Sequence, residues 1–257
     1  MTAPAGYRDA VLVLLPPSET KATGGDGAPL DLAALGHPAL TPVRGRVAAA
    51  LVRSAADPVA ARAALGLSER QADLVQANAA LFEAPTLPGL RRYTGVLYDA
   101  LGYDTLPRAA RARADELLVV ASALFGLVRA TDRIPAYRLS GGSVLPELGP
   151  LPALWRPVLG PVLRAVDGPV LDLRSGAYAA LAPVPGAITV RVLTEHADGS
   201  RSVVSHFNKH HKGLLVRALV SSRAQLDDLA GVLRVTRRAG YRVEPTGPTS
   251  FDLLTAG

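Results

Sequence analysis

Three short, largely apolar runs predict the centre of a β-sheet. The first is residues 10–15, which are all apolar and end at Pro16-Pro17. The other two are residues 116–121 and 169–173. Runs of this length, bounded by turn residues, are typical of strands buried on both faces. The loop that follows the first run is polar and rich in glycine, and loops that leave strands in this way usually carry the ligand-binding groups of α/β proteins.

Helical periodicity dominates the segment from about 42 to 114. Apolar residues recur there at spacings of three and four, which indicates helices with one buried face. Gly66, Pro85 and Gly102 interrupt the pattern. The predicted helices of this segment are residues 44–54, 58–65, 68–82 and 88–101. Later in the chain, helices are predicted at residues 154–166, 175–181, 214–220 and 225–239.

Strict alternation of apolar and polar residues predicts a hairpin. Residues 188–195 and 201–207 alternate, and Asp198-Gly199 between them has the residues of a type I′ turn. A two-residue turn at this place would pair Val190 with Phe207. The chain then leaves the second strand through a basic turn at residues 208–213.

These elements together predict the fold class. Strands alternate irregularly with helices, include an antiparallel pair and end with a short strand at 241–244. We therefore predict a mixed α/β (α+β) fold in a single domain, residues 1–257. Its central mixed sheet would include the antiparallel hairpin near 188–207, and a helical insertion would lie near 42–114. A doubly wound sheet is not expected.

Composition excludes several classes of site and partner. The chain of 257 residues has no Cys, which excludes disulfides, thiolate metal sites and a Cys nucleophile. Its five His lack a standard zinc spacing, so no metal and no cofactor is predicted. The longest uncharged stretch, residues 175–190, is shorter than the ~20 residues that cross a membrane. The sequence therefore predicts a cytoplasmic protein without a membrane partner.

The basic residues are distributed unevenly between the two types. The net charge of +6 favours an anionic partner, and of the 28 basic residues only Lys21, Lys209 and Lys212 are lysines. An ammonium group is a compact charge that can lose its proton when it is desolvated, whereas a guanidinium group stays charged. In a chain that otherwise uses Arg, the three Lys therefore mark positions where the compact group is needed.

Three turns are candidate anion sites. Residues 16–21, Pro-Pro-Ser-Glu-Thr-Lys, place Lys21 and two hydroxyls just past the first strand, where they could hold an anion or could form only a capped surface turn. Ser175 opens a helix after the strand at 169–173, where helix amides could bind an anion or Ser175 could simply cap the helix. Residues 208–213 hold two Lys and two His, which suit phosphates but also suit a solvated basic loop.

Seven motifs in this order resemble the YaaA family of peroxide stress proteins, and the chain looks like an actinobacterial member. The resemblance covers nearly the whole chain. The motifs are Pro16-Pro17-Ser18-Glu19-Thr20-Lys21, Arg92-Tyr93-Thr94-Gly95, Ser122-Ala123-Leu124-Phe125-Gly126 with Arg129, Ile134-Pro135-Ala136-Tyr137-Arg138-Leu139, Leu154-Trp155, Leu173-Arg174-Ser175-Gly176-Ala177-Tyr178, and Phe207-Asn208-Lys209 through Lys212-Gly213.

The resemblance implies a function and a set of site residues. It implies a protein of the peroxide stress response that binds duplex DNA non-specifically through a basic cleft and limits iron-driven oxidative damage. A helix-hairpin-helix element would lie at about 58–82, with Gly66 and Ser68 in its turn, although Ser68 stands where the usual hairpin has a second Gly. The candidate anion- or phosphate-binding residues are Ser18, Lys21, Arg92, Tyr93, Ser122, Arg129, Tyr137, Arg138, Ser175, Tyr178, Asn208, Lys209 and Lys212.

An enzyme is the alternative hypothesis. It would act on a nucleotide-like or other anionic small molecule, with Lys21 or Lys209 as catalytic base or nucleophile. The two hypotheses differ in geometry: a closed pocket too small for a duplex favours the enzyme, and an open groove favours duplex binding.

Overall fold

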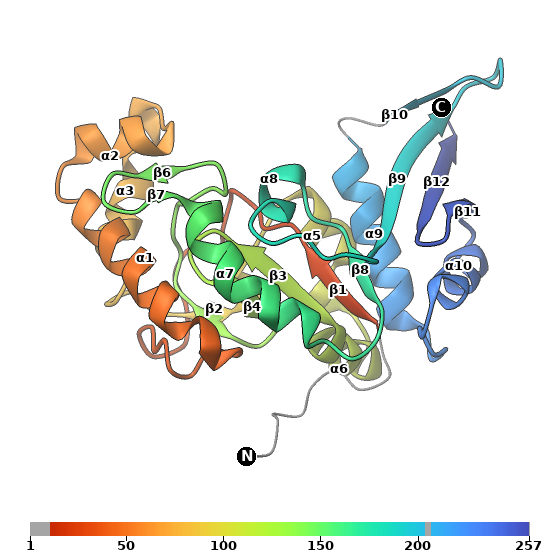
Figure 1. Ribbon diagram of the computed structural model, residues 1–257, viewed down its shortest axis with the longest axis horizontal. Coiled ribbons are helices and arrows are strands. Elements are labelled where there is room, and N and C mark those ends of the chain that lie inside the picture. Colours follow the sequence, from red (N-terminus) through yellow and green to blue (C-terminus); the bar gives the residue numbers. More distant parts are fainter. Residues whose placement is uncertain (1–10, 204–206, 257) are drawn as a thin grey trace.

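One eight-stranded sheet forms the centre of the computed structural model, which describes residues 11–203 and 207–256 (Figure 1). The strands lie in the order β11-β12-β9-β8-β1-β3-β4, and β10 pairs with β9 beside this path. Their bounds are β1 Leu12–Leu15, β3 Leu118–Ser122, β4 Gly126–Arg129, β8 Val170–Asp172, β9 Ile188–Glu195, β10 Arg201–Val203, β11 Arg242–Gly247 and β12 Ser250–Ala256.

Parallel and antiparallel pairs are both present, which confirms the predicted mixed sheet. The five adjacent strands from β12 to β3 are all parallel to their neighbours, whereas β11, β10 and β4 pair antiparallel at the margins. Every residue of β1 and β3 is buried. A parallel strand covered on both faces needs apolar residues throughout, and this explains the runs in the sequence.

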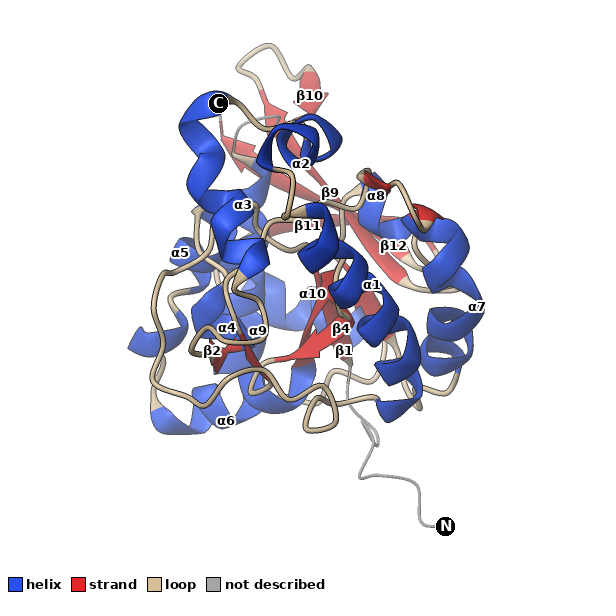
Figure 2. Cartoon of the chain, turned by 90° about the vertical axis from the view of Figure 1, so that its left-hand side faces the viewer, coloured by secondary structure: helices blue, strands red, loops and turns tan. Residues whose placement is uncertain are grey.

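Helices cover both faces of the sheet (Figures 1 and 2). Helix α7 (Leu151–Arg164) lies on one face, and α5 (Val96–Leu101), α6 (Arg108–Leu117) and α9 (Asn208–Ser221) lie on the other. The sheet is therefore closer to a doubly wound arrangement than the sequence predicts. On the α7 face, the buried Trp155 donates a hydrogen bond from Nε1 to the Ala123 carbonyl, 2.8 Å away.

The segment from 42 to 114 is helical, as predicted, but two of its helices are shorter than the pattern indicates. The predicted helix at 88–101 divides into α4 (Gly89–Arg92) and α5, because Gly95 between them has a positive φ of 97°. The predicted helix at 68–82 begins as a 3-10 turn. The helices and short turns are η1 Pro38–Leu40, α1 Thr41–Ser54, α2 Pro58–Leu65, η2 Glu69–Gln71, α3 Ala72–Ala79, α4 Gly89–Arg92 and η3 Tyr103–Thr105.

The remaining elements are two helices and two small ladders of short strands. Helix α8 (Gly176–Ala179) follows β8, and α10 (Leu229–Arg238) precedes β11. Two small antiparallel ladders lie outside the main sheet. They pair β2 (Leu87–Pro88) with β5 (Arg133–Ile134), and β6 (Val144–Leu145) with β7 (Gly149–Pro150). Within residues 11–203 and 207–256, none of the helices has the length and apolar character needed to cross a bilayer.

The predicted two-residue turn of the hairpin is wrong. Arg201 pairs with Glu195, and His196 N–H donates to the Ser200 carbonyl, so the loop has three residues. Gly199 has a φ of 79°, and the Asp198 carboxylate accepts the Ser200 N–H at 2.9 Å. These bonds favour the three-residue loop that ends in a left-handed glycine. The register shifts by one residue, and the predicted pairing of Val190 with Phe207 is not formed.

The predicted basic turn at 208–213 is also wrong in its structure. Helix α9 begins at Asn208 rather than at 214, so both lysines lie in its first two turns. Phe207 directly precedes this helix and is not part of β10, and residues 204–206 of the predicted strand lie outside the described residues. The first five residues of the helix are polar, so the apolar periodicity did not indicate where the helix begins.

Candidate functional site

Three predicted motifs meet at the carboxyl edge of the parallel strands. Residues 16–21 follow β1, Ser122 ends β3, and residues 173–178 follow β8. Strands β3 and β8 flank β1 on its two sides, so the strand order reverses at β1. Such a reversal leaves a crevice beyond the carboxyl ends, where ligands bind in open α/β sheets.

A chain of three buried hydroxyls forms the interior of this site. Ser122 Oγ lies 2.8 Å from Tyr137 Oη, which lies 2.8 Å from Tyr93 Oη. Ser122 Oγ also accepts the backbone N–H groups of Leu124 and Phe125, at 3.2 and 3.0 Å. With both lone pairs of Ser122 occupied, its proton goes to Tyr137, and a single phenol proton lies between Tyr137 and Tyr93.

The two phenols of this hydroxyl chain belong to a group of four tyrosines, which we call the tyrosine cluster: Tyr93, Tyr98, Tyr137 and Tyr178. The rings of Tyr93 and Tyr98 stack with their centroids 5.6 Å apart, and Tyr98 Oη donates to the Pro16 carbonyl at 2.8 Å. Burial raises the pKa of Tyr93 and of Tyr178 to about 12, and raises the pKa values of Tyr98 and Tyr137 well above 10. All four phenols are therefore protonated at neutral pH.

Lys21 places its amine against this cluster. Its Nζ donates to the Ser18 carbonyl at 3.0 Å and lies 4.3 Å from the ring centroid of Tyr137 and 5.4 Å from that of Tyr93. Burial, together with the charge of Arg92, lowers the pKa of Lys21 to about 7. A substantial fraction of the amine is therefore neutral near pH 7.

This amine is expected to make stability depend on pH. Unfolding restores its ordinary pKa of 10.5. Between pH 7 and 10.5 the unfolded chain binds more protons than the folded protein, so the free energy of unfolding rises with pH by up to ~1.4 kcal/mol per pH unit. From about pH 7 to about pH 8.5, urea unfolding should show the wild type gaining about 1–2 kcal/mol relative to Lys21→Met. Below about pH 6 the difference should be constant, and parallel curves across the whole range would contradict the shift.

The two lysine-bearing motifs meet around one pocket. Lys209, in the first turn of α9, lines a pocket of about 250 Å³ together with residues 16–20 and 94–98. Gly95 allows the close approach, because a Cβ there would lie 3.2 Å from Thr20 Oγ1 and 3.3 Å from Ser18 Oγ. The pocket is too small for a duplex and has room for about one sugar phosphate.

Four other predicted residues near the site differ in whether the protein supplies them with a partner. Arg138 pairs with Glu19 at the surface of the site. Lys212 Nζ donates to the Leu173 carbonyl at 3.1 Å, and burial lowers its pKa. Ser175 is exposed at the start of α8. Asn208 begins α9, and its buried Oδ1 has no hydrogen-bond partner among the described residues.

Two predicted arginines are not placed to bind a ligand in the crevice. Arg92 binds backbone carbonyls, and Arg129 lies away from the crevice. Arg92 is fully buried and donates to the carbonyls of Ile134, Ala22, Gly24 and Pro85. Four of its five N–H groups are thus engaged by backbone. Arg129 ends β4 at the opposite end from Ser122 and pairs with Asp132 at 3.0 Å. Neither placement favours contact with a ligand phosphate.

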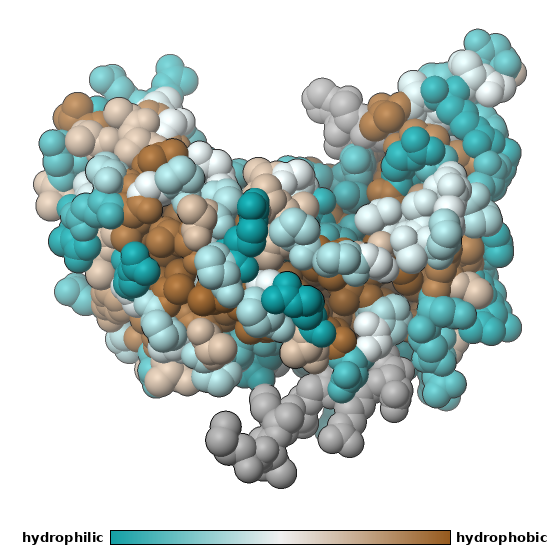
Figure 3. All heavy atoms as spheres, in the orientation of Figure 1, coloured by the Kyte–Doolittle hydropathy of each residue, from teal (hydrophilic) through white to brown (hydrophobic). Residues whose placement is uncertain are grey.

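A broad hollow lies above the site (Figure 3). The lobe formed by α1, α2 and α3 rises on one side of it and the end of the C-terminal sheet on the other, with α8 between them (Figure 1). Helices α2 and α3 occupy the segment of the predicted helix-hairpin-helix, and Gly66 has a φ of 63° in their connection. Ser68 N–H donates to Gln71 Oε1 at 3.1 Å, and residues 58–82 carry no net charge.

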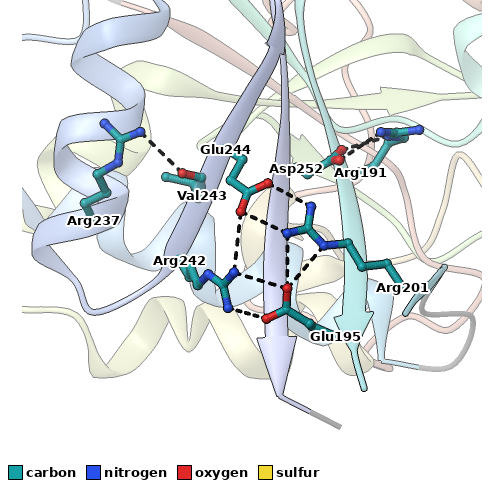
Figure 4. Close-up of polar contacts among 8 residues, drawn as sticks. All are labelled: Arg191, Glu195, Arg201, Arg237, Arg242, Val243, Glu244 and Asp252. Atoms are coloured by element: carbon teal, nitrogen blue, oxygen red, sulfur yellow. Dashed lines mark hydrogen bonds and ion pairs between the residues drawn. The ribbon is translucent and has the colours of Figure 1, made fainter. Parts of the chain in front are cut away.

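The arginines of the C-terminal sheet are neutralised by carboxylates (Figure 4). Arg201 and Arg242 both contact Glu195 and Glu244. Arg191 Nε and Nη2 each lie 2.8 Å from an oxygen of Asp252. This rim of the hollow therefore presents less free positive charge than its arginine content suggests.

Sequence reasoning missed Tyr98 and the pairing role of Glu19. Tyr98 lies on α5, five residues after Tyr93, and its apolar neighbours Val96 and Leu97 gave it the pattern of a core residue. In the sequence, Glu19 is only one member of the turn at residues 16–21. The one available signal was its place within the same short motif as Lys21.

The chain is similar to one family over nearly all of its length. A family model described as peroxide stress protein YaaA matches residues 11–246. The UPF0246 protein CE1889 of Corynebacterium efficiens is 49% identical over 238 residues, covering 91% of this chain and 95% of the relative. The UPF0246 protein SCO2297 of Streptomyces coelicolor is 48% identical, covering 95% and 98%. A UPF0246 protein of Flavobacterium johnsoniae is 29% identical and covers 56% and 61%.

Proposed function

The chain belongs to the YaaA family of peroxide stress proteins, and from this we propose that it binds the backbone of duplex DNA in the hollow above the site. The identity to the relatives from Corynebacterium efficiens and Streptomyces coelicolor is consistent with the family resemblance that the sequence motifs indicate. Binding would not depend on base sequence, would take place in the cytoplasm, and would limit iron-driven oxidation of DNA.

The hollow is the observation that carries this proposal (Figure 3). It is a broad concave surface in this view, whereas the pocket lined by Lys209 accepts only a small group. Lys209 is exposed in the first turn of the 14-residue helix α9, where the helix dipole also favours an anion. The protein's net charge of +6 attracts a polyanion from a distance.

The proposed contact with DNA involves few phosphates. The guanidinium groups of the C-terminal sheet are paired, Arg92 holds backbone, and Arg138 pairs with Glu19. We infer that about two or three phosphates are neutralised, and each contributes about one unit to the dependence of log K on log salt. Binding should therefore be weak and moderately dependent on salt.

Raising salt from about 50 to about 200 mM should weaken binding of a short labelled duplex about 10- to 40-fold, measured by fluorescence anisotropy. Lys209→Gln should reduce the salt slope by about one unit, because it removes one phosphate contact. Arg242→Gln removes the same charge from a group that is paired in the C-terminal sheet, and its slope should equal that of the wild type.

Equal losses in Lys209→Gln and Arg242→Gln would mean that net charge alone attracts the duplex, and affinity independent of salt would contradict backbone binding.

The proposed protection of DNA against oxidation is tested with the same variants. Nicking of a supercoiled plasmid by ferrous iron and peroxide should fall in proportion to duplex occupancy. Protection that persists in high salt, where the duplex is released, would contradict a role for binding.

One observation favours a second candidate function, an enzyme acting on an anionic small molecule. Lys21 and Lys209 come from distant parts of the sequence and converge on the same short loop, residues 16–20. The pocket there has the size for a small substrate and is lined by Lys209, whereas Lys21 adjoins the pocket without lining it.

A further inference from the structure

The half-buried amines of Lys21 and Lys212 each make one hydrogen bond, fewer than the buried guanidinium groups of this chain, and of the two only Lys212 is near a carboxylate, Asp172. Arg44, Arg92 and Arg174 are buried, and each donates to two or more backbone carbonyls, with Arg174 also paired to Asp172. Lys21 Nζ has a single hydrogen bond, to the Ser18 carbonyl, and no carboxylate among the described residues pairs with it. A cation kept only for structure is expected to have a fuller set of partners.

The residue type points the same way. Arg supplies 25 of the 28 basic residues, yet an amine stands at this position. A guanidinium group stays charged in proteins and is a poor nucleophile, whereas a desolvated lysine amine can lose its proton and attack a carbonyl carbon. Burial and the Arg92 charge lower the pKa of Lys21 to about 7, which supplies the neutral amine at physiological pH.

The hydroxyl chain provides a proton donor beside this amine. The two backbone donors on Ser122 direct its proton to Tyr137, and one phenol proton lies between Tyr137 and Tyr93. We consider the arrangement in which this proton comes from Tyr137. The Tyr93 proton then has no acceptor among the described residues. It belongs to the ring whose centroid lies 5.4 Å from Lys21 Nζ, and although Tyr93 is buried, a ligand oxygen that enters beside the amine would supply the missing acceptor.

Cations next to the same loop would recognise a neighbouring anionic group. Arg138 pairs with Glu19, two residues before Lys21, and Lys209 lines the pocket of about 250 Å³ formed by residues 16–20 and 94–98. Lys21 directly follows the 16–20 wall of this pocket and Tyr93 directly precedes its 94–98 wall, so both adjoin the pocket without lining it. Such a volume holds about eight waters, or one sugar with its phosphate. The ligand chemistry that fits an amine, a hydroxyl donor and two cations is a carbonyl group on a phosphorylated sugar.

We propose that Lys21 is a nucleophile that captures the aldehyde of a phosphorylated sugar as a Schiff base. The neutral amine attacks the aldehyde carbon while Tyr93 hydrogen bonds to the aldehyde oxygen. The N–C bond forms first, giving a carbinolamine. The oxygen then leaves as water and takes both amine hydrogens, so that the imine replaces the C=O bond without any oxidant or reductant.

Two sources share this chemistry: the ring-opened abasic deoxyribose of a damaged duplex, and a free sugar phosphate. The first rests on the proposed duplex binding, and the second does not. In either case the chain would hold a reactive carbonyl covalently rather than only shield it.

Trapping with cyanoborohydride tests the proposal. The full chain is incubated with an intact duplex, a duplex carrying one abasic site, or ribose 5-phosphate, and adducts are mapped by mass spectrometry. We expect the reduced adduct on Lys21 with the abasic duplex or with ribose 5-phosphate, and none with the intact duplex. The arm that reacts identifies the source. An adduct that maps to Lys209, Lys212 or the N-terminal amine, or no adduct in any arm, would overturn the proposal.

Three variants separate chemistry from folding. Lys21→Arg keeps the charge and should abolish trapping, with thermal unfolding used to verify that it folds. Tyr93→Phe keeps the ring and should slow trapping roughly 100-fold, because only the proton donor is lost. Arg242→Lys adds an ordinary exposed lysine and should leave the yield unchanged, and a matching rise in yield would reveal non-specific reaction.

The pH profile gives a further readout that a structural role would not produce. The trapping rate should rise with a midpoint near pH 7, which is the pKa of Lys21, whereas an exposed lysine would require a midpoint near 10.5. Salt-dependent binding of the intact duplex by the wild type is measured in parallel. If the duplex binds and nothing is trapped, only the Schiff base is refuted. If ribose 5-phosphate is trapped and no duplex binds, only the DNA proposal is refuted.

Discussion

Replacing Arg92 with methionine is expected to lower the free energy of unfolding by about 3–5 kcal/mol. The guanidinium group joins the carbonyls of Ala22 and Gly24 to those of Pro85 and Ile134, and the side chain is completely buried. Methionine fills much of the volume but leaves these acceptors without donors. Urea unfolding with linear extrapolation measures the change.

The adjacent Arg91 provides the matched control. It pairs with Asp104 at 2.8 Å, and the two side chains are 43% and 62% exposed. A pair this exposed contributes less than about 1 kcal/mol, so Arg91→Met should be nearly neutral. Similar losses in the free energy of unfolding of the two variants would show that Arg92 contributes through its charge rather than through its hydrogen bonds to backbone carbonyls. Duplex affinity per folded molecule should be unaffected in Arg92→Met.

Replacing Gly213 with alanine is expected to destabilise the protein by about 2–3 kcal/mol, despite the better helix propensity of alanine. A Cβ at this position of α9 would lie 2.2 Å from the Leu97 carbonyl oxygen and 2.8 Å from Ala100 Cβ. Both atoms belong to α5, so the two helices must move apart. Because α5 follows Gly95 and α9 carries Lys209, the shift should also widen the pocket.

Gly45 offers the opposite case in a helix of the same length. It lies in the second turn of the 14-residue α1, and its Cβ would meet only Leu32 Cδ1, at 4.0 Å. Gly45→Ala should therefore stabilise the protein by up to about 1 kcal/mol. Both changes are measured by urea unfolding. A stabilised Gly213→Ala variant would contradict the close packing of α5 against α9.

The parallel core of the fold could be predicted from the sequence, and its margins could not. The runs at 10–15, 116–121 and 169–173 became β1, β3 and β8 because strands buried on both faces require apolar residues. Strand β4 was missed because its four residues follow a tight turn directly after β3. Strand β12 forms a hairpin with β11 but also pairs in parallel with the distant β9, and local periodicity does not report that second pairing.

The sequence predicted which residue types form the candidate site. It did not predict which of these residues are available to a ligand and which bind other parts of the protein. The rarity of lysine drew attention to Lys21 and Lys209, and the structure places both beside the loop at residues 16–20. Sequence patterns treat all arginines alike, so they could not distinguish Arg92, which holds four carbonyls, from an arginine available to a phosphate. That distinction depends on tertiary contacts.

The position of β12 also affects how the chain folds during synthesis. Strand β9 leaves the ribosome more than 50 residues before β12, its parallel neighbour, so one edge of β9 stays unpaired while the intervening chain is made. An open edge of this kind can pair with another nascent chain. Arg191 and Glu195 place charges along β9, and charged residues of this kind act as gatekeepers against aggregation until β12 arrives.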